Sequence, residues 1–241
     1  MQRSGLFISL EGVDGCGKST QTGLLADWLR KHTGAQVIAT REPGGTEMGK
    51  TLRQLIQHGE DMDPRTEALL YAADRAHHVS TKIRPALNSG GIVLTDRYLD
   101  SSVAYQAAGR QLPADQIEQL SLWATDGLLP DVTVLLDLDP KEAAARQVGE
   151  LDRIEKAGLA FQERVRAGYL ERAKQEPGRW FVVSGNGAET QVFEAIKAVL
   201  EPVIKAWEQK PTQNLGEVSS AVSAGGVEAM MLNSAPVRAA V

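Results

Sequence analysis

The sequence predicts an α/β protein with a five-stranded parallel sheet and helices on both faces. Five short apolar segments alternate with segments of helical spacing along the 241 residues. The apolar segments are continuous rather than alternating, which is typical of parallel strands buried on both faces. Glycine, aspartate and arginine cluster just after these segments, and ligands bind at the carboxyl ends of strands in open α/β sheets.

The predicted strands cover residues 6–10, 36–40, 91–95, 132–137 and 180–184. Helical spacing follows the first strand, with Leu24, Leu25, Trp28 and Leu29 on one side and Gly34 as a stop. Further helices are predicted over residues 48–58, 65–88, 115–126, 141–176 and 189–207. The result is one domain, residues 1–207.

Residues 208–241 differ in composition from the rest of the chain. They contain no aromatic residue, are rich in Ala, Ser, Gly and Val, and show no sustained hydrophobic period. A segment of this kind buries too little apolar surface to fold, so we predict a mostly disordered tail. A short partner-binding helix at residues 227–232 is the alternative.

Composition and charge exclude several classes of protein. The net charge is −5 and no basic block stands out, so we expect no nucleic-acid partner. The single cysteine, Cys16, excludes an internal disulfide and a zinc site built on several cysteines. No stretch approaches the roughly 20 apolar residues of a membrane span, so we expect no membrane partner and a cytoplasmic location.

The first strand leads into a phosphate-binding motif. The segment GVDGCGKS, residues 12–19, fits the pattern G-x-x-x-x-G-K-[ST] and lies between an apolar strand and an amphipathic helix. Its backbone N–H groups and the helix N-terminus bind phosphate oxygens, and Lys18 reaches the outer phosphates. Ser19 offers a hydroxyl to Mg²⁺. Cys16 is interpreted as a small residue in a tight loop.

Other classes of P-loop protein fit less well. A GTPase would show an N-K-x-D motif and a D-x-x-G switch, and we find no N-K-x-D, while Leu99 stands third after Asp96. Another nucleoside or nucleotide kinase of the same fold is one remaining alternative. A regulatory or partition ATPase is the other, although the acidic charge argues against it.

Three further segments suggest a second, anionic ligand. Arg41 and Glu42 precede a Pro-Gly-Gly turn, where the backbone can approach a ligand closely. Tyr71 and Arg75 are four residues apart, so both lie on one helix face, where they suit a nucleobase. Arg97 follows the third strand and can bind a phosphate.

Five motifs in chain order make the sequence resemble the bacterial thymidylate kinase family over residues 6–207. They are EGVDGCGKST, REPGGT, LLYAADR, DRYLDSSVAYQ and GELDRIE. The resemblance implies a P-loop fold like that of nucleoside monophosphate kinases. It implies phosphorylation of dTMP to dTDP with Mg-ATP in dTTP synthesis, Mg²⁺ as cofactor, and a homodimer.

The resemblance also implies roles for individual residues. Tyr71, where the family often has Phe, stacks on thymine, Arg75 bonds its exocyclic oxygen, and Gln106 reaches the base. Tyr105 lies near the sugar 2′ position. The other acceptor residues implied are Asp14, at the sugar 3′-hydroxyl, and Arg41, Glu42, Arg97 and Ser102. Residues implied to bind ATP are Gly12, Val13, Asp14, Gly15, Cys16, Gly17, Lys18, Ser19, Thr20 and Arg146, and those implied to hold the metal are Ser19 and Asp96.

The lid, about residues 141–156, is where the sequence departs most from the family. Gly15 stands where some relatives carry a P-loop arginine, and the lid keeps only Arg146 and Arg153. We predict Arg153 as the catalytic lid arginine, together with Lys18, Arg97 and Asp14 as catalytic residues, and place Arg146 on the adenine or the phosphates. His77 and His78 are interpreted as exposed structural residues.

Overall fold

The computed structural model describes residues 4–147 and 149–209. Its five strands are β1 (Leu6–Glu11), β2 (Val37–Arg41), β3 (Ile92–Asp96), β4 (Val132–Asp137) and β5 (Trp180–Ser184). They form a single parallel sheet in the order β2-β3-β1-β4-β5. The predicted fold class is therefore confirmed. Of the predicted disordered tail, Glu208 and Gln209 end the last helix and the remainder lies outside the described residues.

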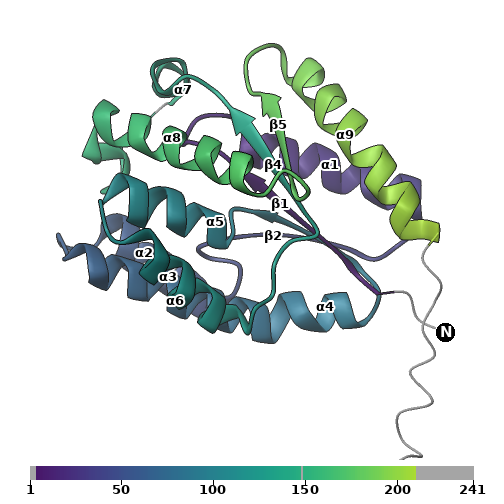
Figure 1. Ribbon diagram of the computed structural model, residues 1–241, viewed down its shortest axis with the longest axis horizontal. Helices are drawn as coiled ribbons and strands as arrows, with labels where there is room; N and C mark the ends of the chain where they lie inside the picture. The colour runs from purple at the N-terminus through teal and green to yellow at the C-terminus, as the bar shows by residue number, and fades with distance from the viewer. Residues whose placement is uncertain (1–3, 148, 210–241) are drawn as a thin grey trace, which may run out of the picture.

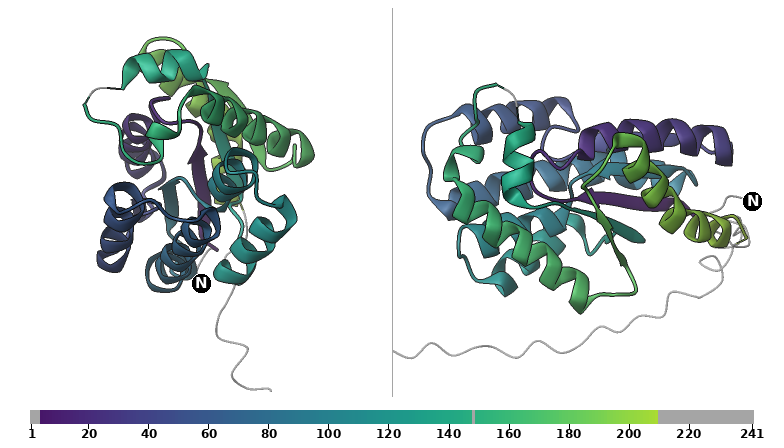
Figure 2. Two further views of the ribbon diagram at one scale, coloured as in Figure 1. Left: turned by 90° about the vertical axis from the view of Figure 1, so that its left-hand side faces the viewer. Right: turned by 90° about the horizontal axis from the view of Figure 1, so that it is seen from above.

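The α-helices surround this sheet (Figures 1 and 2). They are α1 (Lys18–Thr33), α2 (Glu47–His58), α3 (Pro64–His78), α4 (Arg84–Asn88), α5 (Leu99–Ser102), α6 (Ala114–Thr125), α7 (Pro140–Arg146), α8 (Leu159–Gln175) and α9 (Glu189–Gln209). The structure also contains two π-helical turns, η1 (Val79–Ile83) and η2 (Val103–Gly109), and a 3₁₀ turn, η3 (Glu155–Ala157). Among the described residues, no helix is long and apolar enough to cross a membrane.

Helices α1 and α9 pack together on one side of the sheet, and α4 and α8 contact strands from the other. The central strand β1 is buried along its whole length, as its continuous apolar sequence predicts. Leu6, Ile8 and Leu10 belong to the main core, whereas Phe7 packs in a second cluster with Val93. Both faces of the sheet are thus covered.

Two of the predicted helices are interrupted. The segment 141–176 is not one helix, because α7 ends at Arg146 and α8 begins at Leu159. Gly149 and Gly158 have φ angles of 108° and 86°, a left-handed conformation that does not continue an α-helix. The predicted helix 65–88 contains the π-helical turn η1, a feature frequent near functional sites.

The carboxyl ends of β1, β2 and β3 meet at one edge of the sheet. Arg41 and Leu10 both pair with Asp96 in the ladder. The loops that follow are joined by two backbone bonds, from Glu42 N to Asp96 O (2.9 Å) and from Arg97 N to Leu10 O (2.9 Å). The unusual residues that follow these three strands are therefore brought to one place.

A buried ion network attaches α5 to α8 and to Arg179, the residue before β5. Asp100 is fully buried and accepts hydrogen bonds from Arg172 Nη2 (2.9 Å) and Arg179 Nη1 (2.7 Å). Arg172 also donates to Glu118 (2.7 Å), and Arg179 donates to Glu176 (2.9 Å). The network fixes the start of α5, which carries the predicted site residue Ser102.

Replacement of Asp100 by Ala should destabilise the protein by about 3 kcal/mol, because two buried guanidinium groups lose their shared carboxylate. Urea unfolding measures this loss. The matched control is Asp27→Ala, which removes the exposed i,i+3 pair with Arg30 and should cost less than about 1 kcal/mol. Equal losses in the two variants would contradict a structural role for the network.

Candidate active site

The P-loop lies between β1 and α1, as predicted, and curls around the ammonium group of Lys18. Lys18 Nζ donates to Gly12 O (3.1 Å) and Val13 O (2.8 Å). A Cβ on Gly15 would lie 2.3 Å from Ala143 O, so only glycine fits there. The loop presents backbone N–H groups and one lysine at a helix N-terminus, which together form an anion-binding site.

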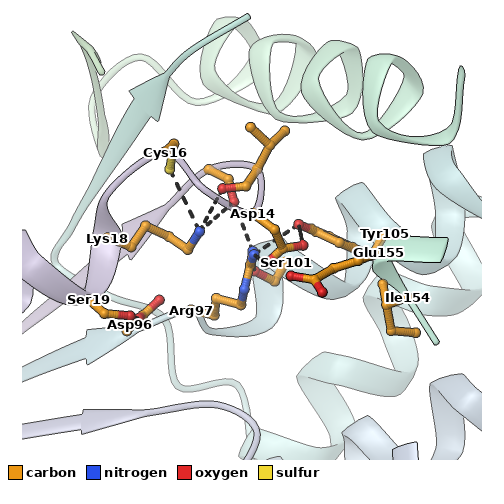
Figure 3. Close-up of polar contacts among 12 residues, drawn as sticks. Asp14, Cys16, Lys18, Ser19, Asp96, Arg97, Ser101, Tyr105, Ile154 and Glu155 are labelled. Atoms are coloured by element: carbon orange, nitrogen blue, oxygen red, sulfur yellow. Dashed lines mark hydrogen bonds and ion pairs between the residues drawn. The ribbon is translucent and has the colours of Figure 1, made fainter. Parts of the chain in front are cut away.

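Ser19 and Asp96 meet at the edge of this loop (Figure 3), where Ser19 Oγ donates to Asp96 Oδ2 over 2.7 Å. The hydroxyl of Ser19, in the first turn of α1, and the carboxylate of Asp96, at the end of β3, are oxygen ligands that suit Mg²⁺, which usually takes few protein ligands and keeps several waters. The residues predicted to hold the metal therefore fit it. Among the described residues there is no cluster of three His, Cys, Asp or Glu side chains that would favour a different metal site.

Arg97 lies between the P-loop and the rest of the site (Figure 3). Its Nη2 bonds Asp14 Oδ1 (2.6 Å) and the Tyr105 hydroxyl (2.8 Å), and its Nη1 bonds Gly12 O (2.9 Å). Its φ angle is 71°, a strained conformation for a residue with a side chain, which costs on the order of 1–3 kcal/mol. Such strain is often found at functional sites, and here it accompanies a guanidinium that contacts both halves of the site.

Asp14 is held by two neighbouring groups. The Tyr105 hydroxyl donates to Asp14 Oδ2 (2.7 Å), and the other carboxylate oxygen pairs with Arg97. Burial alone would raise the pKa of the Asp14 carboxyl, but the charges of Arg97 and Lys18 outweigh it and lower that pKa to about 2. Asp14 is therefore a fixed anion at the mouth of the P-loop.

A second set of residues supports Arg97 from behind. Arg97 Nη1 also donates to the hydroxyls of Ser101 (3.2 Å) and Tyr169 (3.0 Å). Both of these hydroxyls lie within hydrogen-bond distance of Glu11 Oε2, at 2.6 and 3.1 Å. Burial and the nearby Asp100 carboxylate raise the pKa of Glu11 to about 7. Sequence reasoning assigned no role to Glu11 or Tyr169.

Apart from Arg41, the predicted acceptor residues line one pocket, which Arg97 also borders. The lining residues come from four separate segments of the chain and include Asp14, Glu42, Tyr71, Arg75, Ser102, Tyr105 and Gln106. Arg75 is buried at the back of this pocket and donates to Glu42 (2.8 Å), Ser102 (3.0 Å) and Tyr98 O (3.2 Å). These bonds fix the orientation of its guanidinium group.

His78 corrects one prediction. We expected an exposed helical histidine, but its side chain is fully buried, with Nδ1 2.9 Å from Glu42 Oε1 and Nε2 2.8 Å from the Thr40 hydroxyl. It lies four residues after Asp74 on α3, on the buried face of the helix. Its role is to orient Glu42, whose other oxygen holds Arg75.

Arg41 and Arg53 lie nearer to the P-loop. Arg41 does not line the acceptor pocket; it borders the adjoining P-loop pocket with Lys18 and Asp96. Arg53, on α2, lines both pockets and donates to Pro43 O (3.1 Å). Sequence reasoning missed Arg53. Its neighbour one turn later on the same helix face, Gln57, lines the acceptor pocket too, but nothing local in the sequence marks that face.

Arg146 and Arg153, the two lid arginines, lie apart. Arg146 Nη1 donates to Gly185 O (3.0 Å), and the residue borders a pocket shared with Cys16, Gly17 and Thr20 of the P-loop. Arg153 is not brought to the P-loop. Its Nε donates to Ile56 O (2.8 Å) and its Nη2 pairs with Glu67 (2.8 Å). In this arrangement the Arg153 guanidinium is held by α2 and α3, and Arg153 does not line the pockets that border the P-loop.

Known proteins resemble this chain over most of its length. The family model described as thymidylate kinase matches residues 10–196. A thymidylate kinase of Bifidobacterium longum subsp. infantis is 48% identical over 93% of this chain and 99% of its own. One from Clavibacter michiganensis subsp. michiganensis is 52% identical over 84% of this chain and 98% of its own.

A solved structure agrees with these sequences. The crystal structure of thymidylate kinase from Ehrlichia chaffeensis superposes with a TM-score of 0.70 and 33% identity, covering 82% of this chain and all of that one. The resemblance drawn from five sequence motifs is thereby confirmed. The chain belongs to the thymidylate kinase family.

Proposed function

We propose that this chain transfers the γ-phosphoryl group of ATP to dTMP, giving ADP and dTDP on the route to dTTP. The observation that carries the proposal is the position of Arg97. Its guanidinium contacts Gly12 O of the P-loop and the Tyr105 hydroxyl of the acceptor pocket, so it lies where two phosphate groups would meet. A kinase for a phosphorylated acceptor needs positive charge at this point.

The donor half of the site binds ATP. The P-loop holds the phosphates, and Lys18 exchanges its bonds to the loop carbonyls for bonds to phosphate oxygens. The pocket that Arg146 shares with Gly17 and Thr20 lies beside the loop and takes the adenine side of the nucleotide. Ser19 and Asp96 would hold Mg²⁺, which would supply positive charge to the phosphate oxygens.

The acceptor half binds dTMP in the neighbouring pocket. Arg97 binds the acceptor phosphate, and Asp14 accepts a hydrogen bond from the sugar 3′-hydroxyl. Ser102, whose hydroxyl lies 3.0 Å from Arg75 Nη1, belongs to the base end of the pocket. Tyr105, 5% exposed and bonded to both Asp14 and Arg97, fills the space near the 2′ position and disfavours ribose. At the base end, Tyr71 stacks on thymine while Arg75 and Gln106 bond its polar edge.

The chemistry is an in-line displacement. A phosphate oxygen of dTMP attacks the γ-phosphorus, the bond to the bridging oxygen breaks, and ADP leaves. The acceptor is already an anion, so no strong general base is needed. The protein positions the two reactants and neutralises the charge that spreads over the transferred group, through Lys18, Arg97 and the adjacent Arg53.

Replacement of Lys18 by Met should lower turnover by a factor on the order of 10²–10³, because one charge that stabilises the transition state is lost. Formation of dTDP from Mg-ATP and dTMP, followed by chromatography, measures the effect. Lys174→Met is the control, since Lys174 is an exposed residue of α8. The control should keep full turnover.

Two outcomes would contradict the proposal. One is that the unmodified protein releases ADP at the same rate with and without dTMP, which would make it an ATPase. The other is that Lys18→Met keeps turnover within about twofold, which would place the donor phosphates elsewhere.

We also propose a homodimer, formed through α2, α3 and α6. These helices pack side by side and expose large apolar side chains, with Leu55 47%, Leu69 58% and Trp123 83% exposed. Exposed apolar residues gathered on neighbouring helices are typical of a protein–protein interface, and a second copy of the chain presents the same apolar surface.

Replacement of Trp123 by Asp should convert the dimer to a monomer, because it puts a charge into an apolar contact. Light scattering after size-exclusion chromatography gives the mass directly. Val182→Asp, at a 51% exposed position on β5, is the control and should leave the dimer intact. A monomeric unmodified protein, or a dimer that persists in Trp123→Asp, would overturn this interface.

A cytoplasmic location is part of the same proposal, because ATP and dTMP are substrates found there. Cell fractionation with an antibody to the chain tests it, and recovery in a membrane or secreted fraction would contradict it.

A further inference from the structure

Arg153 is attached to two helices outside its own segment. Its backbone N–H donates to Gln57 O (3.0 Å), its Nε donates to Ile56 O (2.8 Å), and its Nη2 lies 2.8 Å from Glu67 Oε2. Its side chain is only 12% exposed. Three contacts thus join the segment 149–158 to the end of α2 and to α3.

Glu67 is the centre of this attachment. Its side chain is 1% exposed and accepts hydrogen bonds from Gln106 Nε2 (3.0 Å) and from Arg110 Nε (3.1 Å) and Nη2 (3.0 Å). Burial alone would raise the pKa of Glu67, but its bonds from Arg110 and Gln106 outweigh burial and lower that pKa. Glu67 is therefore a buried anion shared by Arg153, Arg110 and a residue of the acceptor pocket.

The neighbours of Arg153 form part of that pocket. Asp152 and Ile154, on either side of it, both line the acceptor pocket together with Gln57. Asp152 Oδ1 accepts from the backbone N–H of Ile154 (2.8 Å) and Glu155 (2.9 Å), so these bonds hold the turn together. The contacts of Arg153 consequently set the position of one wall of the pocket.

We propose that Arg153 is a positioning residue for the acceptor, which fixes this wall and Gln106 together through their shared partner Glu67. The proposal rests on the proposed function in that the pocket takes dTMP. It replaces the direct phosphate contact that the sequence suggested for Arg153.

The location of the residues next to Arg153 agrees with this role. In Figure 3, Ile154 and Glu155 lie on the far side of Arg97 from Lys18. To reach the transferred phosphate, the Arg153 guanidinium would have to leave Glu67 and Ile56 O, at the cost of a buried ion pair. The observed contacts therefore favour a role at the acceptor rather than at the donor phosphates.

The first test needs no activity. We would measure amide hydrogen exchange over residues 150–158 in the ligand-free full chain for Arg153→Gln, Glu67→Gln and the control Arg110→Gln. The control removes a guanidinium from Glu67 without removing Arg153. Exchange should accelerate at least tenfold in the first two variants and stay within about twofold in the control. Unchanged exchange in Arg153→Gln would overturn the proposal, whatever the substrate.

The second test separates acceptor binding from chemistry. Arg153→Gln should raise KM for dTMP about tenfold and lower kcat less than threefold, and the double variant with Glu67→Gln should be no worse than the more affected single variant. A hundredfold or greater fall in kcat with unchanged KM would mean a phosphate contact and would overturn the proposal. Additive effects in the double variant would also overturn it.

If Glu67→Gln does not fold, KM for dTMP in Arg153→Lys tests the proposal in its place. A lysine keeps a positive charge beside Glu67 and loses the Nε bond to Ile56 O, so its KM should lie between those of the unmodified protein and Arg153→Gln. A KM for Arg153→Lys equal to that of Arg153→Gln would contradict the ion pair as the source of the effect.

Discussion

The ion pair between Asp14 and Arg97 is the interaction on which the rest of the site depends. It joins the P-loop after β1 to the loop after β3, and the two groups are 2.6 Å apart. The pairing follows from the sheet order, because β1 and β3 are neighbours and their carboxyl ends lie level. A parallel sheet with this order therefore places a phosphate-binding loop and an arginine at the same edge.

Hydrogen bonds from the surrounding structure offset the backbone strain at Arg97. The backbone of Arg97 is left-handed, and its side chain is held by three hydroxyl groups as well as Asp14. Two of those hydroxyls, from Ser101 and Tyr169, are in turn held by Glu11. Tyr169 belongs to α8, so that helix helps to hold the guanidinium. Such packed support preorganises charge before the substrates arrive.

The sequence alone predicted the five strands, their parallel arrangement and the P-loop. The strands were recognisable because buried parallel strands are continuous apolar runs, and the P-loop because its pattern is specific. The break between α7 and α8 was missed, since the charged residues around Gly149 and Gly158 keep a helical composition. An isolated glycine is tolerated within a helix, so it is weak evidence that a predicted helix ends.

Pairings between distant residues were beyond sequence reasoning. Nothing local shows that His78 is buried against Glu42, or that Arg153 pairs with Glu67, 86 residues earlier in the chain. Both pairs form because helices that are remote in sequence pack around the acceptor pocket. A motif can identify which arginines belong to a site, but only the packing decides which anion each of them contacts.

The central claim about this protein is that its acceptor pocket selects a thymine deoxynucleoside monophosphate. The most direct measurement is kcat/KM, from ADP release with Mg-ATP, for dTMP, dUMP, ribose TMP, dCMP and dGMP, with a reaction lacking acceptor. We expect dTMP to be preferred, with dUMP a poor second, and little ADP to form without an acceptor. Preference for another base, or equal use of ribose TMP, would contradict the roles given to Tyr71, Arg75 and Tyr105.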